Sequence, residues 1–228
     1  MNTNDSLEEY IVAFIDVLGS TENIKTNSKK SLEIMHEAYS ESIKMLERIH
    51  EGKIIKPEVK IFSDNIVVAM PRNGVLEQAA FLSVIMMSAI IQVAFLKREL
   101  LTRGGIASGD FFIDDMMVWG NALIKAHEME SSIAVYPRVV IEPKLIGQLG
   151  LASEDCKHKS KEWMLKDEDG FFVVDYINRF LKNQNMFTFG LLDVVDEKVA
   201  CNLDKLKVCQ KWNWLSTYLV NKIATMKE

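Results

Sequence analysis

Two aspartates, Asp16 and Asp64, stand at positions in the sequence where a carboxylate could do chemistry. Asp16 ends the apolar run YIVAFID, and Asp64 separates the short β-rich runs VKIFS and IVVAM. Burying either carboxylate costs about 2–7 kcal/mol without compensation, and two carboxylates in one place repel each other. A divalent cation compensates both effects, because Mg²⁺ and Mn²⁺ combine one or two carboxylates with phosphate and water. The pair therefore predicts a metal site, provided that the fold brings the two residues together.

The residues Gly19, Ser20 and Thr21 follow Asp16 almost directly and open a predicted helix. The unpaired N–H groups of a helix N-terminus favour an anion, and a glycine lets the backbone approach a ligand closely. Two acids for metal and a helix start for phosphate together predict a nucleoside triphosphate site. The alternative is that Asp16 only caps the helix and that Asp64 only makes a turn.

The order of apolar runs and turn residues predicts the elements that must position this pair. We expect strands over 9–16, 59–63, 66–70, 104–114, 116–120 and 137–143, and a late hairpin over 161–177 that turns at Asp169-Gly170. We expect helices over 21–50, 78–96, 120–132 and 196–228. The first hairpin should turn at Asp64-Asn65, because both residues tolerate the backbone angles of tight turns. This order predicts an α+β fold with flanking helices over a central, mostly antiparallel sheet and a C-terminal helical extension.

The uncharged run from Gln78 to Leu96 is long enough to cross a bilayer. It contains polar residues, Ser83, Ser88 and Gln92 among them, and the sequence has no second run of this kind. A helix that is apolar on nearly all sides is also typical of the buried centre of an α/β domain. We therefore expect a core helix and no membrane association.

The composition excludes several classes of protein. The chain has 228 residues, is 48% hydrophobic and carries a formal net charge of −5, with a pI near 5.5. A nonspecific nucleic-acid binder would need a basic face, so no nucleic-acid partner is expected. The three cysteines lack paired or metal-type spacing, and the polar, acidic N-terminus is not a secretory signal. These features predict a cytoplasmic protein with reduced thiols.

Four segments, FIDVLGST, KIFSDNIVV, RGGIASG and VWGNALIKA, resemble the motifs of class III nucleotidyl cyclases, which have a ferredoxin-like fold. The match runs from about residue 9 to residue 142. The phrase WGNALIKAHEMESSIAVYPRVVI and the closing KWNWLSTYL resemble most the bacterial antiphage pyrimidine cyclases, called Pycsar cyclases. This resemblance implies a catalytic core over 1–150, with 151–228 as a C-terminal hairpin and helix packed on it.

The resemblance implies that UTP or CTP is converted to cUMP or cCMP plus pyrophosphate as an antiphage signal, with UTP slightly favoured. It implies two divalent ions, Mg²⁺ or Mn²⁺, held by Asp16, Asp64 and the Val17 carbonyl. The substrate-binding residues that it implies are Leu18, Gly19, Ser20, Thr21, Lys60, Phe62 and Met117. It also implies a head-to-tail homodimer with active sites at the interface.

The sequence departs from the family pattern at the residues that act on the transition state. The family usually places an Asn and an Arg on the helix after the Trp-Gly turn, where this chain has Ile124 and Glu128. Either the protein does not cyclise a nucleotide, or another cation replaces the Arg. Arg103 and Lys125 are the candidates, although each could be an ordinary structural or surface charge.

The residues that read the base also depart from the purine pattern. A Lys at the register of Lys60 occurs in adenylate cyclases, but Met117 cannot act as the Asp that accepts from adenine N6. The purine pocket is therefore incomplete, which agrees with a pyrimidine substrate.

Two other functions compete with a pyrimidine cyclase. One is a catalytically inactive, cyclase-like module that binds a nucleotide or dimerises. The other is another palm-type enzyme, a polymerase or dinucleotide cyclase, against which stand the missing GG[DE]EF-like hairpin and the missing basic groove. The acidic residues Asp110, Asp114 and Asp115 are interpreted as a solvated loop, with an extra metal site as the alternative.

Overall fold

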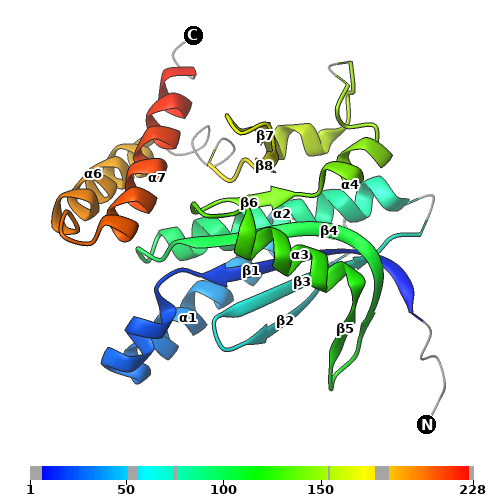
Figure 1. Cartoon of the computed structure of the whole chain (residues 1–228), viewed down its shortest axis with the longest axis horizontal. Coiled ribbons are helices and arrows are strands. Elements are labelled where there is room, and N and C mark those ends of the chain that lie inside the picture. The colour runs from blue at the N-terminus through cyan, green and yellow to red at the C-terminus, as the bar shows by residue number, and fades with distance from the viewer. Residues whose placement is uncertain (1–6, 51–55, 74–75, 154, 178–184, 226–228) are drawn as a thin grey trace.

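The computed structural model describes residues 7–50, 56–73, 76–153, 155–177 and 185–225. Its centre is one eight-stranded sheet in the order β2-β3-β1-β4-β6-β8-β7, with β5 paired to β4 (Figure 1). The strands are β1 (Glu8–Val17), β2 (Glu58–Phe62), β3 (Asn65–Pro71), β4 (Thr102–Ile113), β5 (Val118–Gly120), β6 (Val139–Ile141), β7 (Met164–Lys166) and β8 (Phe172–Val174). Among these pairings only β4 with β6 is parallel. The predicted α+β class with a mostly antiparallel sheet is confirmed.

The alternation of side chains along β1 divides the core into two layers. Ile11, Ile15 and their neighbours of the same parity face a large core that includes helix α2 (Glu77–Leu96), with α1 (Ser20–His50) packed against it. Val12 and Phe14 face the opposite layer, which α3 (Asn121–Ser132) covers. Because β1 is apolar on both faces, it lies between two helical layers at the sheet centre. The strand predicted over 9–16 is confirmed.

Helix α2 is the core helix that the sequence predicts. It is the one helix in the described part of the chain long and apolar enough to cross a membrane, and 89% of its most apolar stretch is buried inside the protein. Phe81 and Phe95 are fully buried, and such side chains each stabilise the fold by about 1.5–3 kcal/mol. The hydroxyls of Ser83 and Ser88 donate to backbone carbonyls one turn earlier, at 3.0 and 2.8 Å. Their polarity is thus satisfied within the helix.

Two predicted helices are interrupted. In α1, predicted as continuous, Asn27 has non-helical backbone angles, and its side chain accepts from the backbone N–H of Lys30 at 3.1 Å, as a helix cap does. The terminal helix predicted over 196–228 is two helices, α6 (Asn185–Cys201) and α7 (Leu206–Thr225), of which 226–228 lie outside the described residues. A turn at 202–205 separates them, where Asn202 N donates to the Val199 carbonyl.

Two short elements lie between the sheet strands and were not predicted, α4 (Pro143–Gln148) and the 3-10 helix η2 (Lys159–Trp163). The C-terminal part joins the same core as the N-terminal part. Strands β7 and β8 extend the sheet, and Trp163, Trp212 and Leu215 are buried in the core layer that contains α2. The division of the chain at residue 150 stays a prediction.

Candidate active site

The fold brings Asp16 and Asp64 to the same edge of the sheet. Asp16 lies near the end of β1, opposite Asn65 of β3 and Arg103 of β4. Asp64 lies in the tight turn that enters β3, and its carbonyl accepts from the Val17 N–H at 3.2 Å. Neighbouring antiparallel strands are about 4.8 Å apart, so the two aspartates are near neighbours. The juxtaposition that the sequence predicts is present within one chain.

The turn that carries Asp64 is shifted by one residue from the prediction. It consists of Ser63 and Asp64 rather than Asp64 and Asn65, and Asn65 already pairs with Phe62 across the hairpin. Ser63 takes the left-handed conformation that the turn requires, with φ of 57°. The shift leaves Asp64 at the tip of the hairpin, beside the end of β1.

Arg103 links Asp16 to an acidic residue on α3, Glu130. Its Nε lies 3.4 Å from Asp16 Oδ2, and its Nη2 lies 2.6 Å from Glu130 Oε1. The side chain of Asp16 is 21% exposed and that of Glu130 only 4%. Burial raises the pKa of Asp16; the Arg103 charge opposes the rise and the Asp64 charge adds to it. Burial likewise raises the pKa of Glu130, again against Arg103. One guanidinium is therefore shared between two carboxylates, and a third, Asp64, lies close to Asp16.

Asp64 is held in its ionised form. Burial by itself would raise its pKa, but the hydroxyl of Ser20, which donates to its carboxylate, and further hydrogen bonds lower the pKa overall. Asp16 and Asp64 thus have pKa values pushed in opposite directions. Such a split between two neighbouring carboxylates marks a candidate functional site, because perturbed pKa values cluster at functional sites.

The two carboxylates suit a hard divalent cation whose other coordination positions a phosphate substrate would fill. In the described residues there is no group of three or more His, Cys, Asp or Glu side chains that could hold a metal alone. The chain therefore offers the two carboxylates of Asp16 and Asp64. Mg²⁺ is commonly bound through one or two carboxylates, with water and phosphate oxygens filling the other positions. The residues fit the predicted ions on this chemistry.

The segment that joins β1 to α1 leaves room beside the aspartates. Gly19 has a φ of 78°, and a Cβ placed there would meet no atom within 4 Å. The Leu18 N–H is engaged with the Leu101 carbonyl at 2.8 Å, and the Ser20 hydroxyl is engaged with Asp64. Thr21 is exposed in the first turn of α1. Of the residues predicted here to bind substrate, Gly19 and Thr21 have the open surroundings that a phosphate needs.

The residues predicted to read the base lie together on β2 and on the β4–β5 loop. Lys60 Nζ is 3.4 Å from Asp115 Oδ1, and the Met117 N–H donates to Asp114 Oδ1 at 2.8 Å. Phe62 is 45% exposed and its ring centroid lies 6.4 Å from that of Phe14. Phe62 is thus two strands away from Asp16, with Lys60 further along β2.

Of the three acidic residues interpreted as a solvated loop, Asp110 lies on β4 and Asp114 and Asp115 lie in the β4–β5 loop. All three are exposed. They also belong to no group of metal-binding side chains among the described residues.

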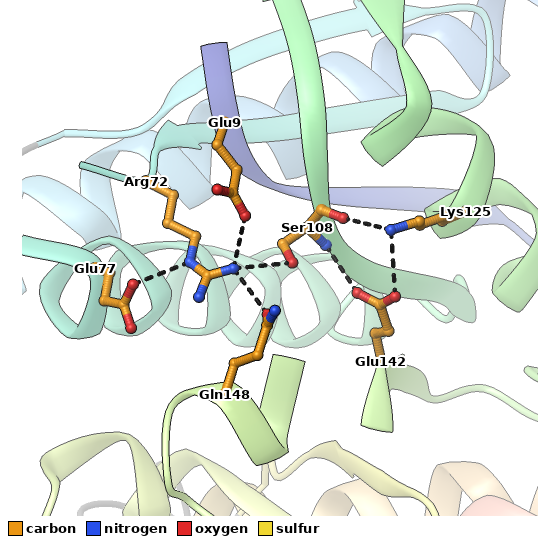
Figure 2. A network of polar contacts seen from close by, with 7 residues as sticks. All are labelled: Glu9, Arg72, Glu77, Ser108, Lys125, Glu142 and Gln148. Carbon is orange, nitrogen blue, oxygen red and sulfur yellow. Dashed lines mark hydrogen bonds and ion pairs between the residues drawn. The ribbon is translucent and has the colours of Figure 1, made fainter. Parts of the chain in front are cut away.

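Lys125 lies away from the aspartate pair of its own chain. Figure 2 shows its ammonium between the Ser108 carbonyl, at 2.9 Å, and the Glu142 carboxylate, at 3.5 Å. Ser108 is five residues from Arg103 along β4, which is roughly 17 Å at 3.3 Å per residue. Ile124 and Glu128, at the registers of the family's Asn and Arg, are exposed on the outer face of α3.

Two residues of the site were not found from the sequence, Glu130 and Lys211. Each left a signal in a helical pattern. Glu130 follows Ala122 and Ala126 at four-residue spacing, so an acid falls on the buried face of α3. Lys211 precedes Leu215 and Leu219 at the same spacing on α7, and its charge interacts with Asp16 and Arg103. A charge on a buried stripe indicates a buried partner or a ligand.

Comparisons with known proteins identify the fold. No family model and no curated protein matches the sequence. Among solved structures, the adenylyl cyclase CyaB from P. aeruginosa has a TM-score of 0.51 at 17% identity, covering 75% of this chain and 95% of that one. An adenylate/guanylate cyclase/hydrolase from Silicibacter pomeroyi has a TM-score of 0.48 at 16% identity, covering 74% and 95%. The chain has the fold of the class III cyclases.

Proposed function

We propose that this chain is a metal-dependent nucleotide cyclase that converts a pyrimidine nucleoside triphosphate, UTP in preference to CTP, to a 3′,5′-cyclic mononucleotide and pyrophosphate. The observation that carries the proposal is the convergence of Asp16 and Asp64 at one sheet edge with more negative charge than Arg103 compensates. The likeness in fold to class III cyclases supports it. A cytoplasmic location and a role as a second messenger in antiphage defence are part of the proposal and come from the sequence resemblance.

Asp16, Asp64 and the Val17 carbonyl are the groups that would hold the two ions. Bound divalent ions supply positive charge that lowers the pKa of the ribose 3′-hydroxyl and neutralises the leaving pyrophosphate. The attack is in line, from the 3′-oxygen onto the α-phosphorus. Ser20 fixes the Asp64 carboxylate by a hydrogen bond, and Gly19 leaves space for the phosphates next to the strand end. Most of the rate would come from this positioning and from electrostatics.

Lys60, Phe62 and Met117 are proposed to contact the base. Phe62 exposes ring surface on which a base could stack. Met117 is 50% exposed and offers no acceptor for an exocyclic amino group of adenine. Such a pocket agrees with a smaller pyrimidine.

A homodimer with shared sites is supported by the outer face of the molecule. Large apolar side chains are exposed on β2, on the β4–β5 hairpin and on α3. On the face that α3 covers they are Phe62, Met116, Met117, Trp119 and Ile124. A second copy of the chain covering this face would remove apolar surface from water and bring α3 against the partner.

An inactive nucleotide-binding module is the second candidate, and one observation favours it. The outward residues of α3 at the family's catalytic registers are Ile124 and Glu128, and neither is a cation. Lys125 is bonded to Ser108 and Glu142, which leaves it no role at the aspartate pair of its own chain. A catalytic part for Lys125 or Arg103 stays a prediction.

The test is to incubate the purified chain with ATP, GTP, CTP and UTP in turn, with Mn²⁺, and to identify products by mass spectrometry. A cyclic mononucleotide from one pyrimidine, absent in Asp16→Ala and Asp64→Ala, supports the proposal. Absence of cyclic product from every nucleotide, together with a nucleotide-dependent rise in melting temperature that either substitution removes, identifies the inactive module instead.

A further inference from the structure

Arg103 lies between two carboxylates, and its contact with each of them is incomplete. Its Nε is 3.4 Å from Asp16 Oδ2, which is longer than most N–H···O hydrogen bonds. Its Nη2 is 2.6 Å from Glu130 Oε1, yet among the described residues no donor makes an aligned hydrogen bond to that oxygen. The guanidinium therefore has a compromise position, in which neither carboxylate forms the short, aligned pair that an arginine can make.

Close packing of α3 on β4 fixes Glu130 beside this guanidinium. A Cβ atom on Gly105, two residues after Arg103, would lie 2.8 Å from Met129 Cβ, closer than real Cβ atoms approach. The glycine thus lets α3 lie directly against the strand. The side chain of Glu130 is only 4% exposed, whereas that of Asp16 is 21% exposed. Of the two carboxylates, Asp16 is therefore the one open to an ion from solvent.

We propose that Glu130 is a positioning residue for the metal-binding aspartate, because it holds the Arg103 guanidinium when a divalent cation takes the Asp16 carboxylate. A cation at Asp16 repels the guanidinium, so metal binding weakens the contact between Arg103 and Asp16. A part-buried guanidinium left without an anion is strongly unfavourable. Glu130 removes this cost, since a small shift turns the existing ion pair into an aligned, charge-assisted hydrogen bond. The inference rests on the metal site of the proposed function and on no particular nucleotide.

Mn²⁺ binding to the full chain, followed by the paramagnetic resonance signal of free Mn²⁺, tests this inference without turnover. We expect Glu130→Gln to weaken the dissociation constant about 10-fold, because Asp16 is then the one carboxylate left to Arg103 and the guanidinium competes with the ion. Glu130→Asp keeps the charge with a shorter reach, so its dissociation constant should lie between those of the wild type and Glu130→Gln. Arg103→Met should bind Mn²⁺ at least as tightly as the wild type, because the competing cation is gone.

A double variant separates positioning from simple attraction of the ion by a nearby negative charge. In the Arg103→Met background, Glu130→Gln should have no further effect, since no guanidinium remains to be held. Glu142→Gln is the matched control, because Glu142 is 15% exposed and pairs with Lys125, away from the aspartates. It should bind Mn²⁺ as the wild type does. Thermal unfolding shows which variants are folded at the temperature of the titration.

The outcomes distinguish this inference from the proposed function. A loss of Mn²⁺ affinity in Glu130→Gln that disappears in the Arg103→Met background supports the inference, even in a chain that forms no cyclic product. An equal loss in both backgrounds would show direct attraction by the Glu130 charge and would overturn it. Wild-type affinity in Glu130→Gln also overturns it, whether or not cyclic product forms. Wild-type Mn²⁺ binding that Asp16→Ala leaves unchanged, or no binding at all, removes the inference together with the metal site.

Discussion

Strand β1 has a polar cluster near each of its ends, and the two clusters differ in how far their charges are compensated. Near its start, Arg72 contacts Glu9 at 2.8 Å, Glu77 at 3.1 Å and Gln148 at 2.8 Å, with Ser108 Oγ at 3.4 Å (Figure 2). The side chain of Arg72 is only 9% exposed. Each of these contacts joins a donor to an acceptor, and together they connect the residue after β3 with β1, β4, α2 and α4.

At the other end of β1, Arg103 is shared between Asp16 and Glu130, with Asp64 close by. Here two carboxylates with little exposure share one guanidinium, and burial raises the pKa of both Asp16 and Glu130. At the Arg72 end one of the two carboxylates, Glu9, is 52% exposed, so water solvates its charge. A buried cluster whose charges are matched serves the fold, whereas one left with an excess of a single sign indicates a missing partner. The difference separates a structural network from a candidate binding site within one sheet.

The largest expected difference between the two ends of β1 is in activity, measured in one variant from each end. Asp64→Asn replaces a charged metal ligand by a neutral amide and leaves the Ser20 hydroxyl an uncharged acceptor, so cyclic product formation should fall at least about a hundredfold. Arg72→Met, assayed where it is folded, should leave kcat/KM unchanged. Mass-spectrometric product rates on both variants check this. An equal loss in both would remove the functional distinction between the ends.

The free energy of unfolding should show the reverse order, with the larger loss in Arg72→Met. Arg72→Met leaves the part-buried Glu77 and the Gln148 amide without their cation, and breaking a buried ionic network costs about 3 kcal/mol. For a chain of this length that corresponds to a fall in Tm of roughly 10 °C. Thermal unfolding followed by circular dichroism measures it. A fall below roughly 2 °C would mean that the network is a surface feature.

Sequence reasoning found the aspartate pair because both signals are local. Asp16 ends an apolar run, and Asp64 lies between two short runs, so strand ends could be recognised without knowing the fold. Antiparallel order then placed them together. The other charges around Arg103 could not be found in this way, because Glu130 and Lys211 come from helices far along the chain whose docking depends on tertiary packing.

The same limit applies to other features that the sequence could not supply. Lys125 is a catalytic candidate from its place in a motif, whereas its contacts with Ser108 and Glu142 depend on how α3 packs against β4 and β6. The break in α1 follows from the Asn27 side chain competing for backbone N–H groups, which a pattern of apolar residues does not register.

A substitution at Lys125 should have a smaller effect and tests whether this residue belongs to the structural end of β1 or to the candidate site. Lys125→Met removes the ion pair with Glu142 and the hydrogen bond to the Ser108 carbonyl. This loss should cost about 1 kcal/mol and lower Tm by roughly 3 °C. Nucleotide KM and kcat should keep their wild-type values. A loss of kcat with an unchanged Tm would instead place Lys125 in the reaction, through the site of a second copy.

The smallest effect is a gain in stability at the candidate site. Burial raises the pKa of Asp16 in the folded chain above its unfolded value, so the folded state holds the proton more tightly. The free energy of unfolding therefore falls as pH rises through the carboxyl range and stays lower at neutral pH. Asp16→Asn cannot ionise, and its Tm at pH 7.5 should exceed that of the wild type by roughly 2 °C.

The pH dependence distinguishes this cause from a general repacking. The difference in Tm should shrink as the pH falls through the carboxyl range, because the wild-type carboxyl then takes up its proton. Differential scanning calorimetry of both proteins between these pH values measures it, with Asp110→Asn, at an exposed acid on the same sheet, as the control. A Tm for Asp16→Asn below that of the wild type at neutral pH would show that Arg103 compensates Asp16 fully. In that case the two ends of β1 would not differ in their charge balance.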